Sequence, residues 1–203
     1  MLKSIEKIKI KNLRINEMKK VLIVYGTRYG STEEVSKKIA EILRENEILA
    51  SIQNLKKIKS KSQLNLEGYE GLIIGSGIKV GKWTKETRKF LEYNLEIFKS
   101  TSKILGVFVS SGFASNPQKI EELKVEYIEK VLNQYEIKAD LLDVFGGVLD
   151  LSKESNLNTL EKKMIRMVSK NDPNIKPHQK NDFRNWEQIH EFAVKFANLV
   201  KSV

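Results

Sequence analysis

The sequence predicts an α/β protein with a doubly wound, open sheet of five mostly parallel strands and helices on both faces. Short β-branched runs without polar interruption are typical of strands buried on both faces. Segments with helical periodicity alternate with these runs, which indicates right-handed βαβ units. A chain of 203 residues is also too short for an eight-stranded barrel, which needs roughly 250 residues.

The N-terminal half supplies three of the expected strands. Val21–Tyr25 is a continuous apolar run that ends at Gly26, and it predicts a buried strand. Ala50–Gln53 predicts a weak edge strand, and Gly71–Gly75 predicts a second buried one. The helix expected between the first two strands has apolar residues at helical spacing: Val35, Ile39, Ile42 and Leu43.

The next part of the chain continues the alternation. A helix is expected over Thr84–Phe98, followed by a strand over Lys103–Val109. Pro117–Gln134 predicts a helix with proline in its first turn. A fifth strand is expected around Leu141–Phe145.

The chain is expected to form one domain over residues 18–203, preceded by a basic extension at 1–17 in which Ile or Leu alternates with Lys. That extension is compatible with an edge strand, a basic arm or a disordered leader. Residues 150–183 form a basic insertion with a helical pattern at Leu157–Lys170. A last helix is expected over 186–201, capped by Asn185. Its buried stripe is predicted to contain Trp186, Ile189, Ala193, Phe196, Ala197 and Val200.

Composition excludes several kinds of site. The chain has no cysteine, which removes disulfides, thiolate metal ligands and cysteine nucleophiles. It has two histidines, so a His-rich metal centre is not expected and no metal is assigned. No apolar run approaches the ~18 residues of a membrane span, so we expect a cytoplasmic protein. The net charge of +10 favours anionic ligands or an anionic surface.

The most informative segment is the loop Gly26–Thr32, between the first strand and the first helix. Ligands bind at this carboxyl edge in open α/β sheets. Unpaired amides at a helix start, the glycines and the loop hydroxyls together suit a terminal phosphate. Ser31 and Glu34 also match a capping box, so an ordinary capped turn is the alternative. The loop is neither a P-loop nor a dinucleotide fingerprint, which favours a monophosphate ligand.

The segment Tyr25–Thr32 resembles the flavodoxin phosphate-binding motif, S/T-x-T-G-x-T, with Tyr29 where flavodoxins have threonine. Its T-R-x-G-x-T form is more similar to the flavin-dependent protoporphyrinogen IX dehydrogenases that use menaquinone. Ile74–Gly81 resembles the third-strand loop of that family, I-G-A/S-S/G-I-R/K-x-G. Asn185–Ile189 resembles its D-W-x-x-V/I helix start.

The resemblance implies a flavodoxin-like fold with strand order 2-1-3-4-5 and FMN as cofactor. It assigns the phosphate to the first loop, with Thr27, Arg28, Tyr29, Gly30, Ser31 and Thr32. The flavin ring is expected between two later loops. The residues assigned to them are Ser76, Gly77, Ile78, Lys79, Val80, Gly81, Trp83, Ser110, Ser111, Gly112 and Phe113.

No acid–base pair stands out, so the catalytic residues stay unassigned and the chemistry is expected to be flavin-centred. Lys79 and Lys82 are candidates for holding an anionic substrate or a reduced, anionic flavin; the alternative is solvated loop charge. Trp83 either packs near the ring or anchors the following helix in the core. Phe113 lies beside the flavin or packs in the core.

A basic, amphipathic helix is the second distinctive feature. Its basic arc is formed by Lys162, Lys163, Arg166 and Lys170. Such an arc suits an anionic membrane face, where it would reach a lipid-dissolved quinone, or the propionates of a porphyrin; the alternative is a plain surface helix. Relatives of the dehydrogenase type carry a similar insertion, but this chain has Leu149–Ser152 where they have an Arg- and Tyr-rich start.

Three functions follow from these features. The first is an FMN oxidoreductase that dehydrogenates protoporphyrinogen IX or a similar reduced substrate and passes electrons to a quinone, peripherally on the inner face of the cell membrane. The second is a flavodoxin-type carrier that serves a redox partner protein and has no substrate of its own. The third is a non-redox module that contacts a membrane or nucleic acid; no nucleic-acid motif supports the latter, so no nucleic acid is expected.

Overall fold

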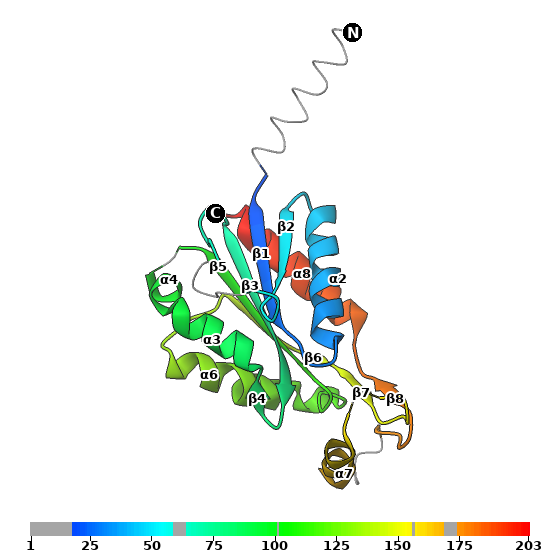
Figure 1. Ribbon diagram of the computed structural model, residues 1–203. Helices are drawn as coiled ribbons and strands as arrows, with labels where there is room; N and C mark the ends of the chain where they lie inside the picture. Colours follow the sequence, from blue (N-terminus) through cyan, green and yellow to red (C-terminus); the bar gives the residue numbers. More distant parts are fainter. Residues whose placement is uncertain (1–17, 59–63, 101, 156, 169–173) are drawn as a thin grey trace.

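The structure is a computed structural model that describes residues 18–58, 64–100, 102–155, 157–168 and 174–203. The basic extension predicted at residues 1–17 therefore lies outside the described residues. Within the described part, a central sheet is covered by helices on both faces (Figure 1).

The main path of the sheet consists of β1 (Lys20–Gly26), β2 (Leu49–Asn54), β3 (Gly71–Lys79), β5 (Ile104–Ser111) and β6 (Leu141–Gly146). These strands lie in the order β2-β1-β3-β5-β6, and every neighbouring pair is parallel. Counted along the chain without the short β4, this is the predicted order 2-1-3-4-5. The fold class predicted from the sequence is confirmed.

The helices divide the core into two layers. Helices α2 (Ser31–Glu45) and α8 (Trp186–Lys201) pack on one face, where Ile39 and Phe196 are fully buried. The other face is covered by α3 (Lys85–Tyr93), α4 (Leu95–Ser100), α5 (Ile120–Lys124) and α6 (Lys130–Gln134), with Phe90 and Ile128 in the core. Apolar residues at helical spacing thus cover an apolar sheet from both sides, as periodicity predicts.

Two helices predicted as continuous are interrupted. The prediction of one helix over Thr84–Phe98 is wrong, because α3 ends before Asn94 and α4 follows it. The Asn94 side-chain amide donates to the Phe90 carbonyl at 2.8 Å, which satisfies an acceptor at the end of α3. The predicted Pro117–Gln134 helix begins as the 3₁₀ turn η2 (Pro117–Lys119) and contains the π-helical segment η3 (Val125–Glu129) between α5 and α6.

Three short strands were not predicted. Strand β4 (Lys82–Trp83) pairs antiparallel with the end of β3. Strands β7 (Val148–Asp150) and β8 (Lys180–Asp182) form a separate antiparallel pair. Strands this short carry too few residues to show an alternating pattern.

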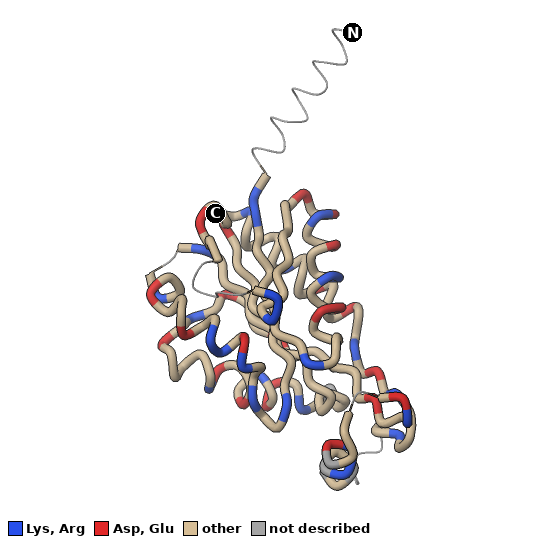
Figure 2. Tube along the Cα trace, in the orientation of Figure 1, with Lys and Arg blue, Asp and Glu red and all other residues tan. Residues whose placement is uncertain are grey.

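The insertion after β6 folds at one end of the molecule (Figure 1). Its amphipathic helix is α7 (Thr159–Val168), shorter than the predicted Leu157–Lys170, and residues 169 and 170 lie outside the described part. A small apolar cluster of Leu149, Leu151 and Ile175 supports the segment. Figure 2 shows side chains of both charges, basic and acidic, around this end of the molecule.

The last helix begins as predicted, since Asn185 accepts hydrogen bonds from the amides of Glu187 and Gln188 at 3.0 and 3.1 Å. One residue of its predicted buried stripe is wrong: Trp186 is 42% exposed. Its ring instead lies 4.7 Å from the guanidinium of Arg184. Within the described residues, no helix is both long and apolar enough to cross a bilayer.

Candidate functional site

The carboxyl ends of β1, β3 and β5 meet at one edge of the sheet, so the loops that follow them converge. A cavity of about 630 Å³ lies at this edge, within the range of roughly 300–1,000 Å³ typical of small-molecule sites. We call it the edge cavity. Its lining comes from the three predicted loops, the first turn of α2, the segment η3 and the insertion with its two flanking strands: Tyr29, Ser31, Glu34, Ile78, Lys79, Val80, Gly81, Gly112, Phe113, Tyr127, Val148, Leu149, Asp150, Ser155, Leu157, Glu161, Ile165 and Lys180.

The first loop leads into a helix start that no side chain caps. Gly30 is the N-cap of α2 in a left-handed conformation, with φ at 99°, and the first helical bond runs from the Glu34 amide to the Gly30 carbonyl. The capping box predicted for Ser31 and Glu34 is wrong, because the Ser31 hydroxyl lies 3.2 Å from the hydroxyl of Ser110 instead. The amides of the first turn thus keep their capacity for an external acceptor, and the helix dipole adds partial positive charge.

The space around this helix start fits an anionic group. A Cβ placed on Gly30 would meet no atom within 4 Å, so the backbone is open to close approach there. The Thr27 hydroxyl accepts a hydrogen bond from the Gly30 amide at 3.0 Å, which orders the loop. Arg28 is exposed beside it. These features suit the phosphate of a mononucleotide bound at a helix N-terminus.

Eight of the predicted site residues line the edge cavity, namely Tyr29, Ser31, Ile78, Lys79, Val80, Gly81, Gly112 and Phe113. Others are structural supports just beneath it. Thr32 is buried, and its hydroxyl would lie 3.1 Å from a Cβ on Gly77. The Ser76 hydroxyl accepts from the Thr84 amide at 3.0 Å, and the Ser111 hydroxyl accepts from the Phe113 amide at 3.2 Å. Lys82 is exposed on β4 and does not line the cavity.

Trp83 belongs to the core. It is 1% exposed and packs in the cluster with Phe90 and Ile128, and its indole N–H donates to the Tyr127 carbonyl. The cavity lining does not include it. Of the two interpretations of Trp83, the structure favours the anchor, although the residue lies in β4 and not in the helix.

A polar contact links the insertion to the first loop. Glu161 of α7 forms an ion pair with Lys79, and the Tyr29 hydroxyl donates to the same carboxylate oxygen at 3.1 Å. Lys79 also donates to the Tyr29 hydroxyl at 3.4 Å. The hydrogen bond from Lys79 lowers the pKa of Glu161, and that carboxylate raises the pKa of Lys79. We call this Tyr29–Lys79–Glu161 group the latch.

The cavity also contains residues that sequence analysis did not assign to the site. They follow β6, and include Leu149, Ser155, Leu157 and Ile165. The Ser155 hydroxyl is buried without a hydrogen-bond partner among the described residues, so the wall has a polar atom to spare for a ligand. A usable signal was present: the insertion begins at the carboxyl end of β6, and that end lies at the same sheet edge as the other loops.

The predicted basic arc of α7 is only partly visible. Lys163 is exposed, whereas the Lys162 ammonium donates to the Ser152 carbonyl at 2.8 Å and holds the loop before the helix. The side chain of Arg166 and the whole of Lys170 lie outside the described part. Met167 is 71% exposed, so α7 presents an apolar side chain near the exposed Lys163.

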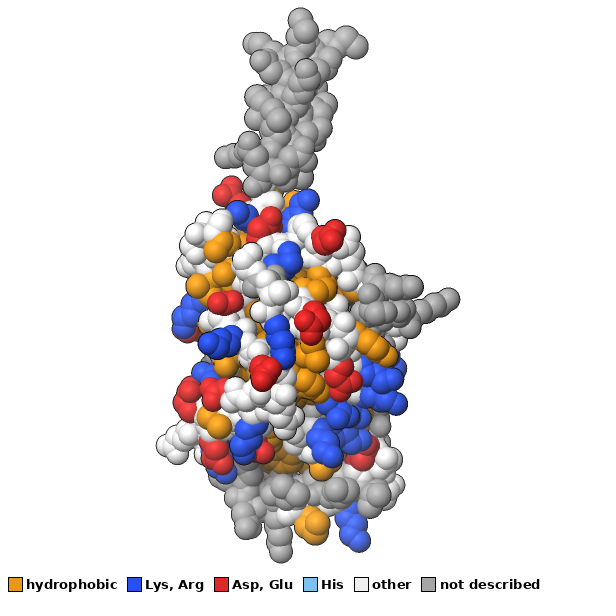
Figure 3. All heavy atoms as spheres, turned by 90° about the vertical axis from the view of Figure 1, so that its left-hand side faces the viewer, with side chains coloured by type: hydrophobic (Ala, Val, Ile, Leu, Met, Phe, Trp, Pro, Cys, Tyr) orange, Lys and Arg blue, Asp and Glu red, His pale blue; other side chains and the backbone are white. Residues whose placement is uncertain are grey.

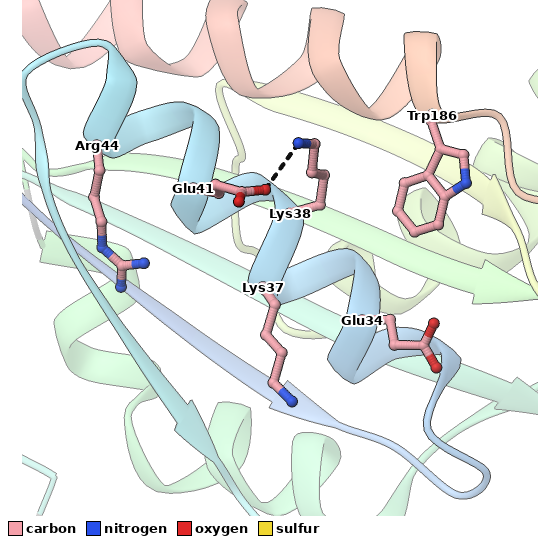
Figure 4. Close-up of a pocket in the computed structure, with 6 residues that line it drawn as sticks. All are labelled: Glu34, Lys37, Lys38, Glu41, Arg44 and Trp186. Atoms are coloured by element: carbon pink, nitrogen blue, oxygen red, sulfur yellow. Dashed lines mark hydrogen bonds and ion pairs between the residues drawn. The ribbon is translucent and has the colours of Figure 1, made fainter.

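A second, open hollow lies between α2 and α8, lined by Glu34, Lys37, Lys38, Glu41, Arg44 and Trp186 (Figure 4). Its lining comes from the outer surfaces of two helices and contains none of the three loops. Among the described residues, no group of three or more His, Asp or Glu side chains is placed to hold a metal ion.

Residues 22–177 match the family model described as a flavodoxin domain. The chain belongs to the flavodoxin family. Proteins of this family have the flavodoxin fold and bind FMN, and this chain is therefore an FMN flavoprotein. The resemblance inferred from the loop at Gly26–Thr32 is confirmed at that level.

The chain is also similar to a protoporphyrinogen IX dehydrogenase (quinone) from Escherichia coli K12. The two are 25% identical over 181 residues, which is 89% of this chain and 96% of that enzyme. This similarity supports an oxidoreductase.

Solved structures agree on the fold. Flavodoxin 1 from Bacillus cereus superposes with a TM-score of 0.54 at 17% identity, covering 88% of this chain and 97% of that one. The rubredoxin oxygen:oxidoreductase from Desulfovibrio gigas gives a TM-score of 0.58 at 18% identity, covering 94% of this chain and 39% of that longer one.

Proposed function

We propose that the chain is a quinone-linked dehydrogenase that oxidises protoporphyrinogen IX or a similar reduced substrate. The observation that carries the proposal is the edge cavity, where the flavodoxin loops meet a cover supplied by the insertion. A pure electron carrier also needs a site for FMN, but it has no need for the cover that Leu149, Leu157 and Ile165 add to this cavity. The similarity to the quinone-dependent enzyme of Escherichia coli supports the same class of reaction.

Each part of the chain has a role in this proposal. The open start of α2, with the Gly30 and Ser31 backbone, holds the FMN phosphate. Loops 76–83 and 110–116 hold the flavin ring. Bound FMN would supply the redox chemistry: it accepts hydrogen from the reduced substrate and passes the electrons on to a quinone. Lys79 and Lys180 are the cationic groups of the cavity lining, and they would orient substrate carboxylates.

The insertion would exclude water and shape the entrance. Leu149, Leu157 and Ile165 contribute apolar surface to the cavity, which suits the faces of a tetrapyrrole or quinone ring. We further propose that the outer side of α7 contacts an anionic membrane surface. The exposed Lys163 and Met167 support this contact, since they combine a cation with an apolar side chain.

An electron carrier without its own substrate remains the competing function. Carriers of the common acidic type present a uniformly acidic face to their partners. The net charge of this chain is +10, and Figure 3 shows basic and acidic side chains interspersed over the face that it displays. The charge pattern therefore argues against a carrier of the common acidic type.

The decisive experiment is an anaerobic assay with protoporphyrinogen IX and a menaquinone analogue. We expect fluorescent porphyrin to form only when both the FMN-loaded protein and the quinone are present. Reduction of the flavin by a reductase without any porphyrin formation would favour the carrier. Flotation with anionic liposomes would test the membrane contact, with a Lys163→Gln variant expected to float less than the wild type.

The phosphate assignment has its own test in Ser31→Asp. A carboxylate at the N-terminus of α2 interacts favourably with the helix dipole, so the variant should be no less stable than the wild type. The same carboxylate repels a phosphate dianion, so FMN affinity should fall on the order of tenfold while riboflavin affinity is retained. Ser31→Ala is the matched control, because it removes the hydroxyl without adding charge. Unchanged FMN affinity in Ser31→Asp would refute the assignment.

A further inference from the structure

The first turn of α2 contains a conflict between folding and binding. Glu33 and Glu34 both lie in this turn, where negative charge stabilises a helix N-terminus. The same charges would repel a phosphate dianion at that terminus. Glu34 matters more than Glu33, because it lines the edge cavity and Glu33 does not.

Each of the two carboxylates has a cation, but the cations come from different places. Glu33 pairs with Lys37 one turn further along α2, at 2.7 Å. Glu34 pairs with Arg184 at 2.5 Å, and this arginine is 150 residues away in the sequence, between β8 and α8. The second ion pair therefore exists only when the chain after the insertion returns to the start of α2.

Arg184 is held in place from several sides. Its Nε and Nη2 atoms donate to the two Asp182 oxygens at 2.8 and 2.5 Å, which is a bidentate pairing. The guanidinium also lies 4.7 Å from the centre of the Trp186 ring. The side chain is only 7% exposed, although Glu34 is 58% exposed. Because Arg184 is already fixed, its side chain loses little further conformational entropy when it pairs with Glu34.

Figure 4 shows Glu34 and Trp186 near the same end of the hollow between α2 and α8. Arg184 contacts both of them, so it lies on the flank of the α2 start, outside the edge cavity. It therefore cannot act as a lining residue of that cavity. Among the described contacts, its link to the helix start is the ion pair with Glu34.

We propose that Arg184 is a positioning residue that holds the Glu34 carboxylate in an ion pair and weakens its repulsion of a phosphate, so that the start of α2 accepts a dianion. The inference rests on the proposed placement of the FMN phosphate at this helix start. It adds a distant determinant that selects FMN over uncharged riboflavin. The ion pair thus reduces the repulsion between the exposed carboxylate and the ligand.

The test compares FMN with riboflavin in the full chain freed of flavin, by quenching of flavin fluorescence at low ionic strength. We expect Arg184→Gln to weaken FMN binding by roughly three- to tenfold and to leave riboflavin binding unchanged. The loss should shrink in high salt, since the repulsion is screened. Arg184→Lys should retain most of the preference for FMN. Glu34→Gln combined with Arg184→Gln should restore it.

Lys37→Gln is the matched control, since it removes the same charge from the partner of Glu33 and should leave the FMN-to-riboflavin ratio near the wild-type value. If Arg184→Gln folds poorly, Glu34→Gln alone still tests the idea, because FMN affinity should be kept or increased. An unchanged ratio in Arg184→Gln, or an equal loss for both ligands, would overturn this inference alone. Equal affinity of the wild type for FMN and riboflavin would instead overturn the phosphate assignment on which it rests.

Discussion

The start of α2 and the insertion between β7 and β8 both border the edge cavity, but they are held in different ways. Helix α2 is anchored by fully buried residues such as Val35 and Ile39, which pack between the sheet and α8. Among its described residues, the insertion and its flanks have a cluster of three buried side chains, at 2–9% exposure, and they reach the first loop through the polar latch. The phosphate site at the start of α2 is therefore held by the core. The insertion that covers the edge cavity depends on fewer buried contacts and on polar contacts that can break locally.

The largest expected effect contrasts two isoleucines. Ile39→Ala should destabilise the protein by about 2–5 kcal/mol, because it leaves a cavity between α2 and the sheet. Ile175→Ala makes the same change in the cluster of the insertion, and should cost less than about 2 kcal/mol because that site can collapse. Denaturant unfolding of both variants provides the measurement. Equal costs would mean that the two regions form one cooperative core.

The junction between the regions offers a second contrast. A Cβ on Gly146 would lie 1.8 Å from the Phe183 carbonyl oxygen, where the returning chain crosses the end of β6. Gly146→Ala should therefore displace this segment and cost about 1–3 kcal/mol. At Gly112 the nearest atom would be Leu149 Cβ at an ordinary 3.4 Å, so Gly112→Ala is the matched control. Thermal unfolding should separate the two, and a similar loss in both would contradict the argument.

The latch should affect local order more than global stability. Glu161→Gln removes the carboxylate that Lys79 and Tyr29 share, so amide exchange in α7 should become faster. Global stability should change by no more than about 1 kcal/mol, as for other partly exposed ion pairs. Hydrogen exchange across α7 and α2 is the measurement. Glu41→Gln, which removes an exposed ion pair on α2, is the control that should leave α7 unaffected.

The smallest effect concerns Asp143 in β6. Burial raises its pKa, against the opposing effects of Lys124 at 3.6 Å and the Gln188 amide at 3.0 Å. A raised pKa in the folded state means that the contribution to stability is present below the unfolded pKa and is lost as pH rises through the folded value. Asp143→Asn should therefore gain at most about 1 kcal/mol at pH 7. That gain should disappear as pH falls toward 4, and a gain that is constant with pH would contradict the assignment.

Patterns among neighbouring residues predicted much of this fold. The apolar runs predicted all five main strands, and the loop at Gly26–Thr32 predicted the flavodoxin family, because glycine, hydroxyl and strand–helix signals lie within a few residues of each other. Predictions failed where distant parts decide the outcome. Trp83 does not line the cavity but lies in the core, where its N–H meets the Tyr127 carbonyl, and Trp186 is exposed beside Arg184 and not buried in the stripe of α8.

The sequence by itself therefore determined the layered α/β architecture, the order of its helices and strands, and the likeness to FMN proteins, because periodicity and short motifs are properties of neighbouring residues. Tertiary structure decided that Ser31 does not cap α2, that the insertion covers the sheet edge, and that Glu161 and Arg184 meet residues of the first loop and helix. Those contacts join residues more than 80 positions apart, and no local pattern specifies such pairs until the chain has folded.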